Sequence, residues 1–347
     1  MTHTQVVGLL VVILAGLSIG LAPLPLKRMR RFQYEQWAFV AMLAGLIVAP
    51  WAVTLLACPD AWGALQTVGF GVLFKGNLFS VGWGIANILF LQCLVRIGVS
   101  LTSGIVGGMT VALGVLIPMV FKGTGVFHNA PALDSRAGWT VLGGVAVIIV
   151  AVIFAATAGY GRERHSRAAA STAQVQSREA FATGLVMAII AGLLGSGISF
   201  AFVYSQGPIV EAMRARGAQD LPAGISVWAS ALLGGALANV LYPAYLMTRS
   251  RSWSLLKESS GEVGLAVLLG LAFIVGFSLL GEGMLLLGVL GASVGFGVQQ
   301  TVQMLGNQAI GFATGEWRDA PRLTIYCALV LLVLAIGILS VGNSFGS

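Results

Sequence analysis

The sequence predicts an all-α integral membrane protein in which ten transmembrane helices form two inverted five-helix repeats. Three observations lead to this fold class. Hydrophobic residues make up 57% of the 347 residues and charged residues only 9%, whereas roughly 25% of the residues in a soluble domain are charged. Ten apolar stretches approach or exceed the length of about 20 residues that crosses the hydrocarbon core of a bilayer. A single long polar segment separates five of these stretches from the other five.

The ten stretches leave little chain between them for a soluble domain. They cover residues 5–23, 35–57, 77–95, 99–121, 137–159, 180–204, 222–247, 263–287, 291–313 and 323–342. The first has no Lys or Arg ahead of it and is followed by polar loops, so we expect a retained helix rather than a cleaved signal peptide. Pro23 ends the first stretch, and Pro243 is expected to interrupt the seventh, because proline removes a backbone donor and kinks a helix.

The polar segment of residues 159–181 reads GYGRERHSRAAASTAQVQSREAF. Its Ser, Ala, Gln and Arg content is typical of a linker. We therefore divide the chain into a first repeat of residues 1–160, a cytoplasmic linker of residues 161–179 and a second repeat of residues 180–347.

The two halves open with similar sequences. GLLVVILAGL begins at Gly8 and GLVMAIIAGL begins at Gly184. Chance is the alternative explanation, because apolar segments resemble one another easily. A unit of five helices crosses the membrane an odd number of times, so a second copy must enter it inverted. Inverted repeats are the usual construction of alternating-access carriers, with the substrate near the middle of the membrane.

The chain has a formal net charge of +7, and its Lys and Arg residues are unevenly distributed among the loops. Fourteen of the 19 basic residues fall in the loops after the odd-numbered stretches. They are Lys27, Arg28, Arg30, Arg31, Arg96, Arg162, Arg164, Arg167, Arg178, Arg249, Arg251, Lys257, Arg318 and Arg322. Basic loops face the cytoplasm, so in a bacterial inner membrane both termini are predicted to be periplasmic. The basic runs can also anchor anionic lipid, and we expect no nucleic-acid site.

The sequence carries no pattern for a metal, a cofactor or covalent catalysis. The three cysteines are scattered without a C-x-x-C spacing, and His3, His128 and His165 all lie in termini or loops. The chain contains no G-x-S-x-G, no phosphate-binding Walker loop and no H-E-x-x-H. We therefore predict a transporter driven by a gradient, with no cofactor, rather than an enzyme.

The ninth stretch carries amides suited to hydroxyl groups. Gln299, Gln303 and Asn307 are spaced four residues apart and share one helical face, and Gln300 lies beside them. Amides donate and accept hydrogen bonds, as sugar hydroxyls require. The alternative is hydrogen bonding between helices, and the sequence leaves both interpretations open.

The third stretch offers an aromatic ring and an amide one helical turn apart, Trp83 and Asn87. Together they can contact the apolar CH surface and the hydroxyls of a sugar, although packing between helices explains Trp83 equally well. Asn239, Tyr242 and Tyr245 in the seventh stretch either close the same cavity or, for the tyrosines, belong to the aromatic belt at the membrane surface. We predict substrate binding at Trp83 and Asn87.

Glu282 lies inside the apolar run FIVGFSLLGEGMLLLGVLG. A charge at membrane depth is costly and usually serves ions, protons or substrate. In the predicted topology Glu282 lies in the outer half of the eighth span, where periplasmic protons reach it. A neutral Glu bonded to a neighbouring helix, or one reaching the outer interface, is the alternative. We predict a role in proton coupling for Glu282.

Several motifs in order resemble the L-rhamnose–proton symporter family of the drug/metabolite transporter superfamily. They are PLKRMRRFQYEQW, APW, WGIAN, RIGVSLTSGIVGG with LGVLIP, GSGISFAFVYSQGPIVEA, GASVGF and GEWRDAP. The resemblance implies ten helices in two inverted repeats, with uptake of a small deoxyhexose coupled to protons. Glu35 matches an acidic position of the family pattern and is a second candidate for proton coupling, although it is expected to pair with Arg30 or Arg31.

Two other functions are weighed against sugar import. An exporter of drugs or metabolites from the same superfamily is the alternative, but a cation exporter would need an acid at the midplane and an aromatic cage. A membrane enzyme acting on lipid-linked sugars would need paired carboxylates within the spans, and the chain has none. The expected partners are a sugar, protons and membrane lipid; the sequence does not predict an oligomeric state.

Overall fold

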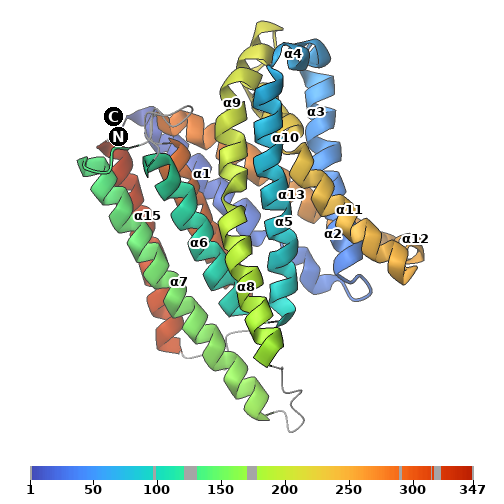
Figure 1. Cartoon of the computed structure of the whole chain (residues 1–347), viewed down its shortest axis with the longest axis vertical. Helices are drawn as coiled ribbons and strands as arrows, with labels where there is room; N and C mark the ends of the chain where they lie inside the picture. Colours follow the sequence, from blue (N-terminus) through green and yellow to red (C-terminus); the bar gives the residue numbers. More distant parts are fainter. Residues whose placement is uncertain are drawn as a thin grey trace.

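The chain folds into an all-helical bundle (Figure 1). The structure is a computed structural model that describes residues 2–96, 99–120, 131–169, 178–288, 291–313, 315 and 322–345. Residues 170–177 of the predicted linker lie outside this description, whereas residues 161–169 continue the preceding helix.

The first half of the chain contains nine helical elements. They are α1 (His3–Leu21), η1 (Leu24–Arg28), α2 (Tyr34–Met42), the π-helical turn η2 (Leu43–Val48), α3 (Ala49–Ala57), α4 (Ala61–Thr67), α5 (Phe70–Arg96), α6 (Val99–Val120) and α7 (Arg136–Ala169). The start of α1 is fixed by a capping box between Thr2 and Gln5. At the start of α2, the backbone amide of Gln33 donates to Oε1 of Gln36 in the first helical turn at 2.9 Å.

The described residues of the second half form nine further helical elements. They are α8 (Arg178–Gly195), α9 (Gly197–Ala215), α10 (Asp220–Ala231), α11 (Leu233–Ser250), α12 (Ser254–Glu258), α13 (Ser260–Leu287), the π-helical turn η4 (Gly291–Gly295), α14 (Phe296–Ala313) and α15 (Arg322–Ser344). The short α12 follows α11 as the short α4 follows α3.

The helices identify a multi-pass membrane protein, although fewer of them qualify as spans than the sequence predicts. Among the described residues, seven helices are long and apolar enough to cross a membrane, and up to eight if the bent pair α10 and α11 counts as one span. All ten predicted stretches overlap helices, but α6 and α14 are not among those seven. The count of ten spans is therefore not confirmed.

The seventh predicted stretch is broken at Leu232 rather than at Pro243. The axes of α10 and α11 meet at 56° there, whereas α11 continues through Pro243 to Ser250. The prediction of an interruption at Pro243 was therefore wrong. The break lies at Leu232 instead, where a side chain from α5 supplies hydrogen bonds to the backbone. Asn77 of α5 donates to the Ser230 carbonyl at 2.9 Å and accepts from the Gly234 amide at 2.7 Å, so both backbone groups freed by the break have partners.

Two apolar cores hold the bundle together. The larger core joins α1, α2, α4, α9, α10 and α13, and includes Phe202, Trp228 and Phe277. The second core joins α6, α7, α14 and α15, with α7 packed along α15. The bent pair α10 and α11 thus contributes to the larger core, and α7 and α15 contribute to the second.

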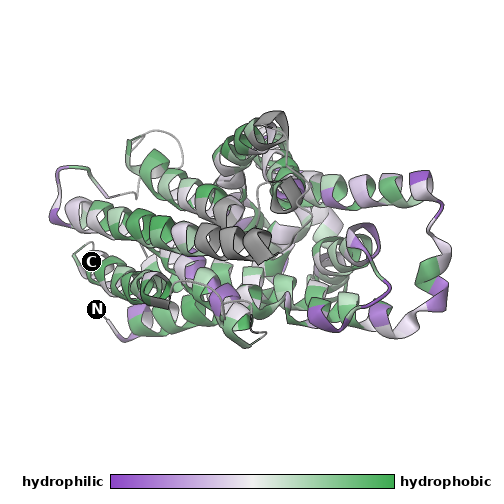
Figure 2. Ribbon diagram, turned by 90° about the horizontal axis from the view of Figure 1, so that it is seen from below, coloured by the Kyte–Doolittle hydropathy of each residue, from purple (hydrophilic) through white to green (hydrophobic). Residues whose placement is uncertain are grey.

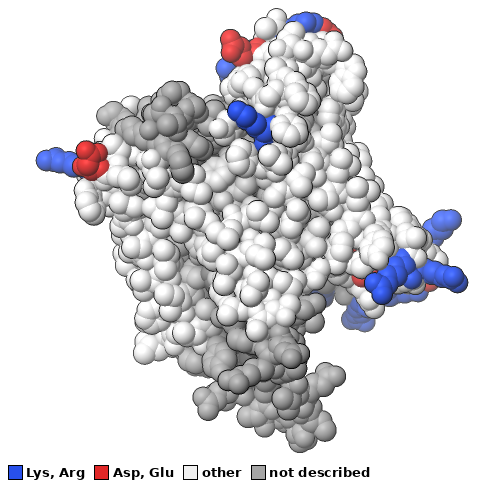
Figure 3. All heavy atoms as spheres, viewed as in Figure 1, with Lys and Arg blue, Asp and Glu red and all other residues white. Residues whose placement is uncertain are grey.

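The outside of the bundle is apolar, as lipid contact requires. Large hydrophobic side chains are exposed on many helices, including Leu56 at 87%, Phe70 at 80% and Leu323 at 77%. Figure 2 shows hydrophobic residues along the helices and hydrophilic residues toward their ends. In Figure 3 one broad face is uncharged, and the Lys, Arg, Asp and Glu residues lie at its margins.

Candidate functional site

The contact between α5 and α11 carries a row of polar side chains beside the break. Besides Asn77, Ser80 accepts a hydrogen bond from the Gly235 amide at 2.7 Å. Asn87 Nδ2 donates to Asn239 Oδ1 at 2.6 Å, and Gln92 Nε2 donates to the Tyr242 hydroxyl at 2.7 Å. These bonds run along one face of α5, so the row joins helices that belong to different halves of the chain.

Asn87 is engaged in this row. Its partner Asn239 is buried and also donates to the Gly235 carbonyl at 2.9 Å. The bond between the two asparagines is of the helix-packing kind that competes with substrate binding. This bond occupies one of the two N–H groups of the Asn87 amide.

Trp83 lies one turn before Asn87 and is half-buried. Its ring meets the ring of Phe277 of α13 edge-on, with centroids 6.1 Å apart. Phe277 in turn stacks on Trp228 of α10 at 5.2 Å, and Trp228 stacks on Phe202 of α9 at 4.7 Å. Trp83 is therefore the edge of an aromatic cluster contributed by four helices. The sequence analysis did not single out Trp228.

The four amides of the ninth stretch lie on α14. Gln299 is buried, and its Nε2 donates to Gln303 Oε1 at 2.8 Å, as expected for residues on one helical face. Gln300 and Gln303 are half-buried, whereas Asn307 is exposed. Asn307 therefore continues the row toward the surface rather than into the bundle.

The predicted substrate residues lie in two different interfaces. Helix α5 packs on α8, α9 and α11, whereas α14 packs on α1, α6 and α15. Among the residues that the structure describes, neither Trp83 nor Asn87 hydrogen-bonds the glutamines of α14. One cavity that joins all four therefore stays a prediction. A groove of about 500 Å³ lies elsewhere, between α1 and α13 on the apolar exterior, and its lining contains none of these residues.

Glu282 is half-buried on α13 and faces α10. Its Oε1 lies 2.9 Å from the position that a Cβ on Gly224 would occupy. The charged groups near enough to act on it electrostatically are Arg214 and Asp220, which pair with each other at 2.8 Å. Glu282 thus lies toward the end of the bundle where α9 connects to α10.

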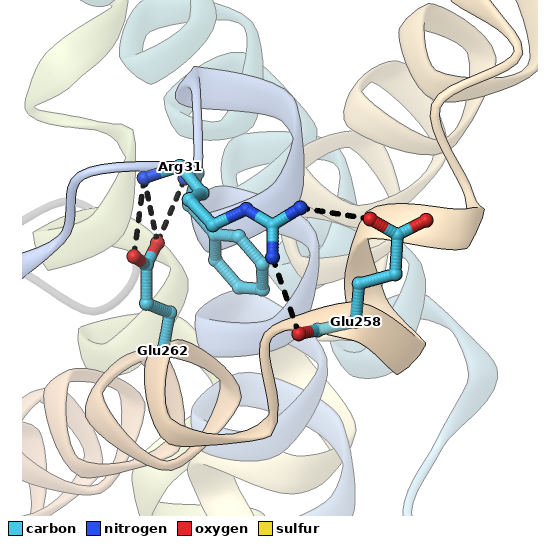
Figure 4. Close-up of polar contacts among 4 residues, drawn as sticks. Arg31, Glu258 and Glu262 are labelled. Atoms are coloured by element: carbon cyan, nitrogen blue, oxygen red, sulfur yellow. Dashed lines mark hydrogen bonds and ion pairs between the residues drawn. The ribbon is translucent and has the colours of Figure 1, made fainter.

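Among the described residues, Glu35 forms no ion pair with Arg30 or Arg31, so the expected pairing is absent. The Arg31 guanidinium pairs with Glu258 at 2.8 Å, and the Arg31 backbone amide donates to the carboxylate of Glu262 at 3.1 and 3.2 Å (Figure 4). The backbone amides of Arg30 and Phe32 donate to the same carboxylate at 3.0 and 2.8 Å. Glu262 lies in the first turn of α13. We call this set of five residues the Glu262 latch; it joins the α1–α2 connection to the start of α13.

A second cross-connection lies near Glu282. Arg216, which follows α9, forms an ion pair with Asp60, which precedes α4. Asp60 also caps α4 by accepting a hydrogen bond from the Gly63 amide at 3.2 Å. We call the Arg216–Asp60 pair the Asp60 latch. The sequence analysis predicted neither latch. The one signal in the sequence was the presence of acidic residues in some connections and basic residues in others.

The chain is similar to proteins of one family over most of its length. The family described as L-rhamnose-proton symport protein (RhaT) matches residues 1–261. An L-rhamnose-proton symporter of Escherichia coli O1:K1 / APEC is 24% identical over 92% of each chain. Proteins with the same name from Klebsiella pneumoniae and Cronobacter sakazakii are 23% and 25% identical, each over 99% of both chains.

Proposed function

Since the chain belongs to the L-rhamnose-proton symport protein family, we propose that it imports a small sugar, L-rhamnose or a similar deoxyhexose, together with protons. The family match over residues 1–261 is the observation that carries this proposal. It is supported by relatives named L-rhamnose-proton symporter, whose similarity extends over at least 92% of the chain. These names describe a transporter rather than an enzyme, and they do not favour the exporter alternative.

The proposed architecture is ten spans in two inverted repeats, residues 1–160 and 180–347. Helix packing supports it. The first helix of the first repeat, α1, packs on α13 and α14; the first span of the second repeat, α8 and α9, packs on α5 and α6. The second spans meet each other through α2 with α11 and α3 with α10, and the fifth spans meet through α7 with α15. Each of these contacts has a counterpart with the repeats exchanged.

Close approaches of helices repeat with the same symmetry. Gly235 of α11 lies against Ser80 and Gly84 of α5, and a Cβ on Gly84 would lie 2.9 Å from the Gly235 Cα. In the counterpart, Gly45 of η2 lies against the backbone of Gly270 of α13. Small residues let helix backbones approach in lipid, so second and third spans of opposite repeats are in tight contact on both sides.

The two latches fit alternating access between the repeats. The Glu262 latch joins the first connection of repeat one to the second connection of repeat two. The Asp60 latch joins the first connection of repeat two to the second connection of repeat one. In the proposed cycle one latch opens while the other stays closed, so that the sugar reaches one side of the membrane at a time.

The proposed substrate residues are Trp83, Asn87, Gln299, Gln300, Gln303 and Asn307. The aromatic cluster around Trp83 and the buried glutamine pair support this assignment, whereas the bond between Asn87 and Asn239 favours helix packing in the present conformation. For proton coupling we propose Glu282, with Glu35 as the second candidate. The half-buried position of Glu282, near a single ion pair of opposite charges, supports that role.

The proposed location is the bacterial inner membrane with both termini in the periplasm. The distribution of basic residues supports this orientation. The Glu262 latch, together with Arg249, Arg251 and Lys257, then lies on the cytoplasmic side, and the Asp60 latch lies on the periplasmic side.

Uptake of labelled L-rhamnose into proteoliposomes tests the proposal. Purified protein is reconstituted, and uptake is measured with an inward proton gradient, without a gradient and with a protonophore. The proposal predicts accumulation above equilibrium only with the gradient, and competition by L-rhamnose or a related deoxyhexose but not by an unrelated amino acid. Empty liposomes are the control. Equal uptake in all three conditions would contradict proton symport, and no uptake of any deoxyhexose would contradict sugar import.

A further inference from the structure

Buried polar atoms without partners gather on α9 and α10. Within the described part of the chain, four buried side-chain atoms have no hydrogen-bond partner, and three of them are Ser205 Oγ, Gln206 Nε2 and Trp228 Nε1. Burying an unpaired donor costs free energy, and a buried indole N–H usually finds an acceptor. These atoms therefore call for an explanation, and a ligand that binds there supplies one.

The indole of Trp228 is held rigidly with its N–H toward α13. The side chain is 2% exposed. Its ring is stacked between Phe202 at 4.7 Å and Phe277 at 5.2 Å, nearly parallel to both. The Nε1 atom borders Gly281, because a Cβ added to Gly281 would lie 3.4 Å from it. The same position lies 3.0 and 3.1 Å from two ring carbons of Phe202, so the gap that Gly281 leaves is bordered by the indole N–H and by the Phe202 ring.

Glu282 directly follows Gly281 on α13, on the same contact between α10 and α13. Its Oε1 lies 2.9 Å from the position of a Cβ on Gly224. Gly224 precedes Trp228 by four residues, so the two share a face of α10. A glycine on each helix therefore leaves room: Gly281 of α13 beside the indole N–H, and Gly224 of α10 beside the carboxyl.

The contact between α10 and α13 thus carries an unpartnered donor, Trp228 Nε1, and an acceptor, the Glu282 carboxyl. A donor and an acceptor together are the complement of a hydroxyl group. Resting on the proposed function, we propose that Trp228 Nε1 and the Glu282 carboxyl together bind one hydroxyl of the transported sugar. The indole N–H donates to the hydroxyl oxygen, and the hydroxyl donates to a carboxyl oxygen. The sugar then contacts the acid assigned to proton coupling, so the two transported species meet at one side chain.

The charged surroundings of Glu282 agree with a neutral ligand. Arg214 and Asp220 are the charged groups close enough to act on it, and they pair with each other at 2.8 Å. Their opposite charges largely cancel, so the carboxyl of Glu282 sets the charge of the site, and the site is neutral when that carboxyl carries a proton. A polyhydroxylated neutral molecule fits this chemistry.

Equilibrium binding of tritiated L-rhamnose to the purified full-length protein tests the proposal. Trp228→Phe keeps an aromatic ring between Phe202 and Phe277 but removes the N–H, and we expect roughly tenfold weaker binding. Trp139→Phe is the matched control, because Trp139 is 68% exposed on α7; its affinity is expected to equal that of the wild type. Unchanged affinity in Trp228→Phe would overturn this inference and leave sugar import intact.

A second pair of variants probes the same space without removing the indole. Gly281→Ala places a methyl group beside Nε1 and should weaken binding, whereas Gly264→Ala on the same helix meets no atom within 4 Å and should not. If Trp228→Phe fails to fold, these two glycine variants still test whether the sugar binds beside the indole N–H. Equal affinity of Gly281→Ala and Gly264→Ala would then overturn the inference. Wild-type protein that binds no deoxyhexose would overturn the proposed function and this inference together.

Discussion

The two latches join equivalent connections at opposite ends of the bundle, but they are built differently. In the Glu262 latch one carboxylate accepts hydrogen bonds from three consecutive backbone amides, and the Arg31–Glu258 ion pair adds to it. The Asp60 latch is an ion pair between two side chains, Arg216 and Asp60, which are 39% and 57% exposed. Exposed ion pairs contribute only about 0–1 kcal/mol.

The difference suggests that the two ends of the bundle do not open with equal ease. When the Glu262 carboxylate separates from the α1–α2 connection, it loses its hydrogen bonds to all three backbone amides at once. An exposed ion pair loses one contact and regains water. We therefore expect the Glu262 end to be the firmly closed one in the conformation described, and the Asp60 end to open more readily.

The joint between α10 and α11, close to the Asp60 end, gives the largest predicted effect on stability. Asn77→Ala leaves the Ser230 carbonyl and the Gly234 amide without their partner, at about 1–3 kcal/mol for each buried group. A marked drop in melting temperature in detergent is expected. Ser278→Ala is the control, because Ser278 bonds only to the Ile274 carbonyl of its own helix. Equal melting temperatures for the two variants would show that Asn77 does not hold the joint.

Disruption of the Glu262 latch is expected to have the next largest effect. Glu262→Ala removes the acceptor of three backbone amides and should open that end. Ser259 is buried at the start of α13, so a Ser259→Cys reporter in a protein without native cysteines measures the opening. Its reaction with a maleimide should speed up about tenfold as local opening becomes easier. A Glu258→Gln variant should give a smaller increase; the reverse order would mean that the ion pair, not the backbone contacts, closes this end.

Disruption of the Asp60 latch should have a smaller effect on stability but a clear effect on access. Asp60→Asn keeps a side chain that can cap α4 and removes the charge that Arg216 needs. Native Cys58 is buried beside this latch, and its labelling should increase several-fold in a protein without Cys93 and Cys327. Arg216→Gln removes the same ion pair and leaves the Asp60 cap of α4 in place, so it should speed up labelling to a similar extent. Unchanged labelling in Arg216→Gln would argue against an ion pair.

The labelling of Cys58 should also depend on pH in a defined direction. Burial raises the pKa of the Cys58 thiol, so at neutral pH the group is a thiol and the reactive thiolate is scarce. Labelling should therefore speed up as the pH rises into the alkaline range, and the increase should begin at lower pH in Asp60→Asn, where water reaches the sulfur. Identical pH profiles for the two proteins would indicate that Cys58 stays buried.

Local sequence patterns were enough to predict the class of fold but not the positions at which helices break. The apolar run of residues 5–23 matches α1 because Pro23 and the length of the run both act locally. The break at Leu232 was missed because Asn77, 155 residues earlier in the chain, supplies its hydrogen bonds. Pro243 was a local signal that tertiary packing overrode, so α11 remains helical there.

In the candidate site, too, contacts within one helix could be predicted from the sequence, whereas contacts between residues distant in the sequence could not. The neighbouring positions of Gln299 and Gln303 followed from helical spacing, as did the shared face of Trp83 and Asn87. The bond from Asn87 to Asn239 and the stacking of Trp228 join residues distant in sequence, and spacing cannot reveal them. Glu282 was singled out because its charge stands out in an apolar run, whereas Trp228 was not singled out because an aromatic residue does not stand out there.

Transport by a Glu282→Gln variant tests the central claim, proton-coupled sugar import, most directly. The substitution keeps the shape of the side chain and removes its titration, while an amide still accepts a hydroxyl hydrogen bond. In proteoliposomes the variant is predicted to exchange labelled for unlabelled L-rhamnose across the membrane, yet to show no accumulation under an inward proton gradient. Glu35→Gln, measured in parallel, should retain accumulation. Concentrative uptake by Glu282→Gln equal to that of the wild type would contradict the account and assign Glu282 a structural role.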